Sequence, residues 1–382
     1  MKADLLGQLI MTGVPGKELD GKTARLFRKV KPGAFILFGR NIESAPQLRK
    51  LTDGLRDLSE IEPIITIDQE GGRVSRLRLI GSEPPNAQQL RDRNDIDLIR
   101  RHGDITGRLL RLFGFNLDLC PVLDISFDDD ADNSLRGRCY GKTVEQVIRN
   151  AGAFNDAMRG RGIASCGKHF PGYSAASSDA HYELPRINRT REQLDGNELA
   201  VFRQFIGRDG PLGHPDGAAH HPSQVDSMML CHGWYPCCEP EKTPATLSHR
   251  IATDLLRNEL GFDGLVMTDD LDMGAILTGY RLEDTIRLAI AAGNDVAMIC
   301  HRIPEIENVQ RILATLPHDQ IDRALQNVSQ FKERLAPPDE FSEAAFRKVD
   351  REIWDLRVAV LGEEGARQTT SQSIQRSPVE RF

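Results

Sequence analysis

Residues 33–68 read GAFILFGRNIESAPQLRKLTDGLRDLSEIEPIITID and contain one complete strand–helix–strand unit. The apolar runs at residues 33–39 and 63–68 lack polar alternation, which is typical of strands buried on both faces of a parallel sheet. Residues 45–58, which lie between these runs, have the apolar spacing of an amphipathic helix. This unit therefore predicts a parallel β-sheet covered by helices.

The same alternation continues along the chain and predicts eight strands. Eight strands that alternate with helices favour a single-domain TIM barrel, a (β/α)8 fold, whose active site lies at the C-terminal ends of the strands. A doubly wound open sheet is the second interpretation. The expected strands are 5–14, 33–39, 63–68, 115–125, 163–169, 227–232, 264–269 and 295–300, and the expected helices are 45–58, 97–113, 144–159, 191–206, 251–260 and 282–292.

The barrel is expected to occupy residues 1–340, with a closing helix near residues 319–335. Residues 207–225 are rich in Gly, Pro and His, and this composition predicts a surface-loop insertion. Residues 341–382 are expected to form a C-terminal extension that is partly disordered at its end, because the sequence from about residue 362 is polar.

The composition excludes several classes of protein. The 382 residues include 49 basic and 56 acidic side chains, and the net charge of −7 argues against nucleic acid as a partner. The sequence has no apolar run long enough for a membrane span and no clear signal peptide. Its seven cysteines are scattered apart from the adjacent pair Cys237 and Cys238, so neither a disulfide framework nor a zinc site is expected. These features predict a cytoplasmic protein.

Polar side chains stand at the ends of most of the expected strands. In a barrel this end of the sheet is the face that carries the active site. Unpaired charges are also costly to bury inside a barrel, which makes a shared polar site the better explanation. The strand-end residues are Asp68, Gln69, Glu70, Asp124, Lys168, His169, His232, Asp269, Asp270, Cys300 and His301.

The stretch GFDGLVMTDDLDMGAI at residues 261–276 ends a strand with two carboxylates, Asp269 and Asp270. Because side chains alternate along a strand, we expect that these two do not both point into one site. One of them is then available for chemistry while the other caps or orients a neighbouring segment. The alternative is that both are acids at a helix N-terminus.

The stretch KHFPGYSAASSDAHYELP at residues 168–185 places Asp179 two residues before His181. A carboxylate at this distance can accept the imidazole N–H and fix the tautomer, which prepares the histidine to give and take a proton. A solvated loop histidine beside a turn aspartate remains the alternative. The stretch IDQEGGRVSRLR at residues 67–78 combines Asp68 with Arg76, a pairing suited to sugar hydroxyls or an anionic group. It lacks the GxGxxG spacing of a dinucleotide site.

Read together, these stretches carry a family resemblance. IDQEGGRVSR, RGRCYG, GKHFPG, DAH and GFDGLVMTDDLDM occur in that order, and the chain resembles glycoside hydrolase family 3 from about residue 5 to residue 335. It is most similar to the single-domain bacterial β-N-acetylhexosaminidases of that family. The resemblance implies that Asp269 is the nucleophile, that His181 is the acid/base with Asp179 as its partner, and that the sugar is bound by Asp68, Arg76, Arg138, Lys168 and His169.

The resemblance also implies the reaction. It is the retaining removal of terminal β-linked N-acetylglucosamine, with no metal and no cofactor. The expected partner is a small carbohydrate, either a GlcNAc-containing saccharide or a muropeptide from peptidoglycan turnover such as a GlcNAc–anhydro-MurNAc fragment. The chain is expected to be a monomer or a weak homo-oligomer.

Several positions depart from the family pattern, and alternatives remain open. Tyr173 and Ser174 stand where KHFPGHG is usual, Ala180 replaces the Ser of D-S-H, and RCYG replaces RSFG. The alternatives within the resemblance are a β-N-acetylglucosaminide phosphorylase, a β-glucosidase-like enzyme and an inactive sugar-binding relative. A metal-dependent barrel hydrolase is a different class, for which the candidate ligands are His169, His232, Asp269 and His301.

Overall fold

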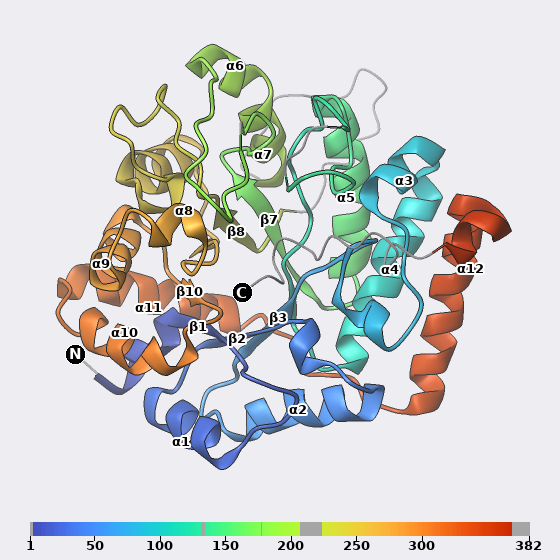
Figure 1. Ribbon diagram of the computed structural model, residues 1–382, viewed down its shortest axis with the longest axis horizontal. Coiled ribbons are helices and arrows are strands. Elements are labelled where there is room, and N and C mark those ends of the chain that lie inside the picture. Colours follow the sequence, from blue (N-terminus) through green and yellow to red (C-terminus); the bar gives the residue numbers. More distant parts are fainter. Residues whose placement is uncertain (1–2, 131–133, 177, 207–223, 369–382) are drawn as a thin grey trace.

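Eight parallel strands of the described residues surround the centre of the molecule (Figure 1). The computed structural model describes residues 3–130, 134–176, 178–206 and 224–368. The strand order is β10-β1-β2-β3-β6-β7-β8-β9, and a parallel bridge between Met267 and Val296 closes the ring. The predicted (β/α)8 barrel is confirmed. The strands are β1 (Ile10–Gly13), β2 (Ala34–Leu37), β3 (Ile64–Ile67), β6 (Leu117–Asp118), β7 (Ala164–Phe170), β8 (Ser227–Leu230), β9 (Leu265–Thr268) and β10 (Ala297–Ile299).

Helices follow the strands and cover the outside of the barrel (Figure 1). The predicted bounds of α5 and α9 agree with the structure, whereas the helix predicted over residues 191–206 is broken at Asn197, where the backbone is not helical. The helices are α1 (Gly21–Val30), α2 (Ala45–Asp57), α3 (Ala87–Arg93), α4 (Ile96–Leu112), α5 (Val144–Arg159), α6 (Arg191–Gly196), α7 (Glu198–Ile206), η5 (Arg250–Glu259), α8 (Gly274–Leu277), α9 (Leu282–Ala292), α10 (Ile306–Leu313), α11 (His318–Lys332) and α12 (Glu343–Arg367). Short 3₁₀ segments are η1 (Ala3–Leu9), η2 (Gly39–Asn41), η3 (Arg76–Leu79), η4 (Ala245–Leu247) and η6 (Ile303–Glu305), and a small hairpin joins β4 (Gln69–Gly71) to β5 (Val74–Ser75).

Local sequence sets where these helices begin. The Ser44 hydroxyl accepts the Gln47 N–H at the start of α2, and the Gln47 side chain accepts the Ser44 N–H in return. At the start of α5, the Thr143 hydroxyl accepts the Gln146 N–H. These caps satisfy backbone donors that have no partner inside the helix.

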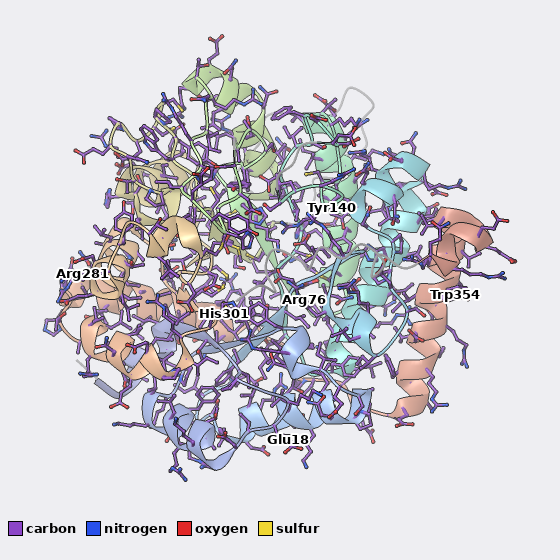
Figure 2. The ribbon with its side chains drawn as sticks, in the orientation of Figure 1. Glu18, Arg76, Tyr140, Arg281, His301 and Trp354 are labelled. Atoms are coloured by element: carbon purple, nitrogen blue, oxygen red, sulfur yellow. The ribbon has the colours of Figure 1, made fainter. Side chains whose placement is uncertain are left out.

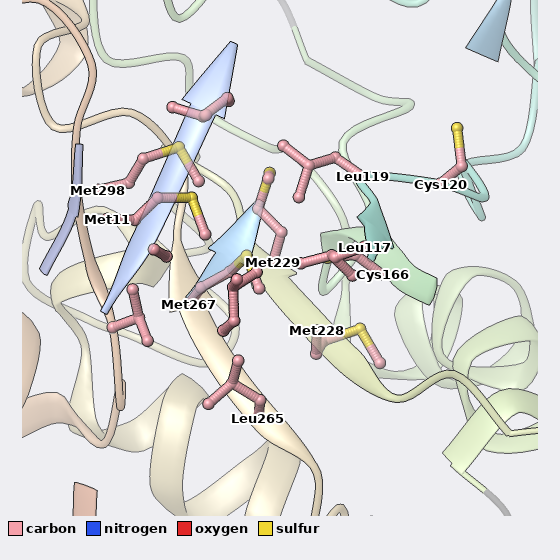
Figure 3. Packing of buried hydrophobic residues seen from close by; sticks show 14 of the residues in the cluster. Met11, Leu117, Leu119, Cys120, Cys166, Met228, Met229, Leu265, Met267 and Met298 are labelled. Carbon is pink, nitrogen blue, oxygen red and sulfur yellow. The ribbon is translucent and has the colours of Figure 1, made fainter. Parts of the chain in front are cut away.

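Apolar side chains fill the barrel, and several of them are methionines (Figure 3). Met11, Met229, Met267 and Met298 are all almost completely buried. A methionine side chain is unbranched and flexible, so it can fill irregular space between the other side chains of a core. The floor of the barrel opening is therefore apolar, and the charged groups lie above it.

The first predicted strand, residues 5–14, is correct only from Ile10 onward. The preceding residues form η1, and Gly7 packs so closely that a Cβ there would lie 1.8 Å from the Val30 carbonyl oxygen. Periodicity alone does not separate a buried strand from a buried helical turn in a short apolar run. The closing helix predicted near residues 319–335 is confirmed as α11.

Helix α12 follows the barrel and packs against α4 (Figure 1). Its buried Arg357 pairs with Glu83 at 3.1 Å. The helix continues to Arg367 through a bend at Gly362, so residues 362–367, which were expected to be disordered, belong to α12. Residues 207–223 of the expected insertion and residues 369–382 lie outside the described part of the chain. In the part that is described, no helix is both long and apolar enough to span a membrane.

Candidate active site

A cleft of about 720 Å³, including its opening to solvent, lies at the carboxyl ends of the barrel strands. Six of the eight predicted site residues line it: Asp68, Arg138, Lys168, His169, His181 and Asp269. Arg76 and Asp179 lie immediately behind Asp68 and His181, respectively, as their contacts below show. In Figure 2, Arg76 and His301 lie near the middle of the molecule, whereas Arg281 and Trp354 lie at its periphery.

Asp269 follows the last residue of β9 and is partly exposed to the cleft. Its backbone N–H donates to the Leu230 carbonyl oxygen at 3.0 Å, which fixes it beside the end of β8. Burial raises the pKa of Asp269, but the nearby imidazoles of His232 and His169 and the N–H of Asp270 outweigh this effect and hold the pKa below its ordinary value. The carboxylate is therefore ionised and ready to act as a nucleophile or an electrostatic partner.

Asp270 also lines the cleft, but its carboxylate is bonded to backbone N–H groups, which agrees with the expectation that one of the two adjacent acids orients a neighbouring segment. Asp270 accepts the backbone N–H groups of Asp272 at 3.0 Å and Cys300 at 3.3 Å. It therefore holds the loop after β9 against the end of β10.

His181 and Asp179 form a close pair on the loop after β7. His181 Nδ1 lies 2.5 Å from Asp179 Oδ1, and the His181 backbone N–H donates to the same oxygen at 3.0 Å. Burial raises the pKa of Asp179, but the hydrogen bonds from His181 outweigh it and keep that pKa below the ordinary value. Since Nδ1 faces Asp179, Nε2 is the nitrogen left for proton transfer in the cleft.

Two further contacts hold this loop in place. The Gly274 N–H donates to the His181 carbonyl oxygen at 3.1 Å, so the start of α8 fixes the loop beside Asp269. Tyr173, one of the departures from the family pattern, is buried. Its hydroxyl donates to the Ser178 carbonyl oxygen and accepts the Ala180 N–H at 2.8 Å. The tyrosine therefore supports the segment that leads into His181.

A buried network of charges forms one wall of the cleft. Lys168 Nζ lies 2.7 Å from Asp68 Oδ1 and 2.6 Å from Glu70 Oε1. Arg138 binds both oxygens of Glu70 at 2.7 Å, and Arg76 reaches Asp68 Oδ2 at 3.4 Å from behind. Burial raises the pKa of both carboxyls, but Lys168 and the arginines outweigh it and lower their pKa below the ordinary values. The network thus presents fixed charges that can bind hydroxyl groups.

His169 stands beside this network and is oriented by Asp124. His169 Nδ1 lies 2.7 Å from Asp124 Oδ2, and the other oxygen of Asp124 accepts the Tyr173 N–H at 2.6 Å. The side chain of Asp124 therefore fixes both the imidazole and the loop that follows β7. Arg138 Nη2 lies 3.4 Å from His169 Nε2, which links the two groups across the wall.

Sequence reasoning assigned Glu70 and Asp124 no individual role in catalysis or sugar binding, and it indicated His232 and His301 only as ligands for the metal alternative, yet all four residues shape this cleft. Glu70 lies inside the quoted IDQEGGRVSR motif, and Asp124, His232 and His301 stand at the ends of predicted strands. These positions are the feature of the sequence that could have identified the four residues. The metal alternative fits the geometry poorly, because His232 Nε2 contacts the Asp270 carbonyl oxygen at 2.8 Å and His301 Nδ1 contacts Arg40 at 3.2 Å. Among the residues that the structure describes, no group of three or more potential ligands is arranged to hold a metal ion.

The comparisons with known proteins agree with this architecture. The model of the glycosyl hydrolase family 3 N terminal domain matches residues 3–331. A beta-hexosaminidase of Alkalilimnicola ehrlichii is 33% identical over 315 residues, which cover 81% of this chain and 85% of that protein. A beta-hexosaminidase of Vibrio cholerae is 32% identical over 340 residues, 88% of this chain and 93% of that protein.

A solved structure is also similar. The glycoside hydrolase family 3 beta-N-acetylglucosaminidase from Paenibacillus sp. strain FPU-7 superposes with a TM-score of 0.83 and 31% identity, covering 94% of this chain and 68% of that one. The family model and these relatives each extend over most of the barrel that carries the cleft. The chain therefore belongs to glycosyl hydrolase family 3.

Proposed function

We propose that the protein is a retaining exo-β-N-acetylglucosaminidase in which Asp269 is the nucleophile and His181 the acid/base. One observation carries the proposal: the carboxylate of Asp269 and the imidazole of His181 line the same cleft, and Asp179 orients the imidazole at 2.5 Å. An ionised carboxylate and an oriented proton carrier are the two groups that double displacement at a sugar requires. The relatives named as beta-hexosaminidases support the choice of reaction.

The reaction proceeds in two steps. In the first step, Asp269 attacks the anomeric carbon while His181 protonates the departing glycosidic oxygen, and a covalent glycosyl-enzyme forms. In the second step, His181 takes a proton from an incoming water molecule, which attacks the same carbon and releases Asp269. Two displacements on one carbon return the sugar with its β configuration, and each passes through an oxocarbenium-like transition state.

The charged wall is suited to hold the sugar during both steps. Asp68, Lys168, Arg138 and His169 all line the cleft, and we propose that their polar groups bind the hydroxyl groups of the sugar. Arg76 lies behind Asp68 with a side chain that is fully buried, so we propose that it positions this carboxylate and does not itself touch the sugar. Fixed donors and acceptors of this kind require little reorganisation when the substrate binds.

The preference for N-acetylglucosamine is proposed from the relatives, since a solved structure at 31% identity is named a beta-N-acetylglucosaminidase. The natural substrate that we propose is a GlcNAc-containing fragment of peptidoglycan turnover, cleaved in the cytoplasm. This assignment rests on analogy within the family.

The deciding experiment compares p-nitrophenyl β-N-acetylglucosaminide with p-nitrophenyl β-glucoside, with and without phosphate, in the presence of EDTA. Fast release of p-nitrophenol from the N-acetyl substrate and retention of configuration at the anomeric carbon, followed by NMR, are the expected results. Preference for the glucoside, inversion, or loss of activity in EDTA would each contradict the proposal.

The assays with phosphate test whether phosphate can replace water as the acceptor of the sugar. The acid/base is an imidazole, which carries no negative charge to repel an anionic acceptor when it is neutral. Acceleration by phosphate, with a sugar 1-phosphate as product, would make the protein a phosphorylase that uses the same two residues. No cleavage of either glycoside would favour an inactive sugar-binding protein.

A further inference from the structure

Cys237 and Cys238 are the most accessible thiols of the chain. All seven cysteines lie in the described residues, and all are free thiols. Cys120, Cys139, Cys166, Cys231 and Cys300 are buried, whereas the adjacent pair is only partly buried. Reagents in solution therefore reach Cys237 and Cys238 before the other five.

The two sulfur atoms already contact each other, with Cys237 Sγ 3.6 Å from Cys238 Sγ. The pair lies in a turn in which the backbone N–H groups of Cys238 and Glu239 both donate to the Tyr235 carbonyl oxygen, at 2.9 and 2.8 Å. The hydrogen bond from the Cys238 thiol lowers the pKa of Cys237 to about 7, with Arg191 nearby adding to the effect. This hydrogen bond therefore favours the thiolate form of Cys237, which is the reactive form of cysteine.

This turn is connected to the loop that carries His181. Trp234 donates its indole N–H to the Glu239 carbonyl oxygen at 2.9 Å, directly after the cysteine pair. The Trp234 backbone donates to the Pro185 carbonyl oxygen at 2.9 Å and accepts the Ile187 N–H at 2.8 Å. Tyr235, in the same turn, donates its hydroxyl to the Gly172 carbonyl oxygen at 2.7 Å. The turn thus contacts the loop on both sides of Asp179 and His181.

We propose that Cys237 and Cys238 form a redox-sensitive dithiol, which a peroxide oxidises to a disulfide between adjacent residues and which thereby lowers turnover. The effect on turnover rests on the function proposed above, whereas disulfide formation does not. A disulfide bond is about 2.05 Å long, so the sulfurs must approach by roughly 1.5 Å. Rotation about the Cα–Cβ bond of each cysteine can bring the sulfurs together, and the disulfide then closes a small ring through the peptide bond, which constrains the backbone of the turn.

The chemistry balances with hydrogen peroxide as the oxidant. The Cys237 thiolate attacks one peroxide oxygen, so that an S–O bond forms, the O–O bond breaks and hydroxide leaves. The Cys238 sulfur then attacks the Cys237 sulfur, which forms the S–S bond, breaks the S–O bond and releases a second hydroxide. Protons from the two thiols convert both hydroxides to water. Two electrons pass from the sulfurs to the peroxide.

The test treats the full-length protein with stoichiometric hydrogen peroxide and measures two independent quantities. Peptide mass spectrometry should find the peptide with both cysteines lighter by two hydrogen atoms, whatever the enzyme acts on. Cleavage of p-nitrophenyl β-N-acetylglucosaminide should fall about tenfold or more in kcat/KM, because small displacements near a reacting group are costly. Dithiothreitol should restore both the mass and the activity.

Matched variants separate this effect from damage elsewhere. The double variant C237S/C238S should keep the basal activity and should lose the response to peroxide, while C237S and C238S alone should form no internal disulfide. Oxidation of Cys237 to a sulfinic acid without a disulfide would overturn the proposal. Disulfide formation with unchanged kcat/KM would overturn its regulatory part. If the untreated protein cleaves no N-acetylglucosaminide, the proposed function fails while the mass measurement still tests the dithiol.

Discussion

At the scale of single residues, the cleft prepares two side chains in different ways. Asp269 is kept ionised because neighbouring imidazoles and a backbone N–H outweigh the cost of its burial. His181 is prepared by geometry, since the carboxylate of Asp179 occupies Nδ1 and leaves Nε2 for the substrate. One group is tuned to hold a negative charge, and the other is oriented to move a proton.

Removing the charge of Asp269 should abolish turnover with little effect on folding. The substitution Asp269→Asn keeps the size of the side chain and the hydrogen bond from the Asp270 N–H. We expect kcat/KM for the aryl N-acetylglucosaminide to fall by about 10⁴-fold or more, because the nucleophile is lost. Circular dichroism and thermal melting should show a folded protein. A variant that retains a tenth of the activity would exclude Asp269 as the nucleophile.

Removing the imidazole should affect substrates according to their leaving groups. In His181→Ala, kcat/KM for a GlcNAc disaccharide should fall by about 10³-fold or more, the usual contribution of a general acid. The loss should be much smaller for a dinitrophenyl glycoside, whose leaving group needs little protonation. Because kcat/KM reports the first displacement, slow hydrolysis of the intermediate does not obscure the comparison. Equal losses for both substrates would argue against His181 as the acid.

At the scale of elements, the site depends on contacts between loops from neighbouring strands. The loop after β7 carries Asp179 and His181, and the start of α8 holds it through Gly274 and Ala275, whose N–H groups donate to His181 and Ala180. Tyr173 supports the same loop from within. The relative position of the proposed nucleophile and acid/base is therefore set by α8, which begins at Gly274, shortly after Asp269.

Adding one carbon atom at Gly274 should disturb this arrangement. A Cβ there would lie 2.5 Å from the His181 carbonyl oxygen and 2.8 Å from that of Tyr182. In Gly274→Ala we expect kcat/KM to fall about tenfold or more as the loop is displaced. Gly279→Ala is the matched control, because no atom lies within 4 Å of a Cβ at that position. Similar activities for the two variants would show that the contact with α8 does not position His181.

At the scale of the whole molecule, the barrel is surrounded by helices whose contacts include buried polar groups. His102 on α4 packs against Phe154 on α5, with ring centroids 5.2 Å apart. Neither of its ring nitrogens has a hydrogen-bond partner among the described residues. Burial lowers the pKa of His102 to about 4, so the native protein holds this imidazole neutral.

This histidine should make the stability of the fold sensitive to acid. The unfolded chain binds a proton at His102 near pH 6.5, whereas the native chain binds it only near pH 4, so stability is full above pH 6.5 and declines as the pH falls between these values. The shift corresponds to about 3 kcal/mol of unfolding free energy. Denaturant unfolding at pH 7 and pH 4.5 should show a smaller loss for His102→Leu than for the unchanged protein. Equal losses would contradict the argument.

Much of the fold and part of the site follow from local sequence. The eight apolar runs lie at the positions of the eight barrel strands, since strands buried on both faces leave a continuous apolar pattern. The strand ends then indicate Asp68, His169 and Asp269 as residues that share one face. The same reasoning assigned residues 5–9 to a strand although they form a 3₁₀ segment, because a short apolar run does not distinguish a buried strand from a buried helical turn.

By itself, the sequence determined the order of strands and helices, the face that carries the cleft and the motifs that assign the chain to its family. The tertiary structure alone decided which distant side chains meet. Arg76 lies behind Asp68, and Glu70 joins Lys168 and Arg138 across the barrel. The physical reason is that local patterns report burial and backbone geometry, whereas these contacts arise only when the closed barrel brings separate strand ends together.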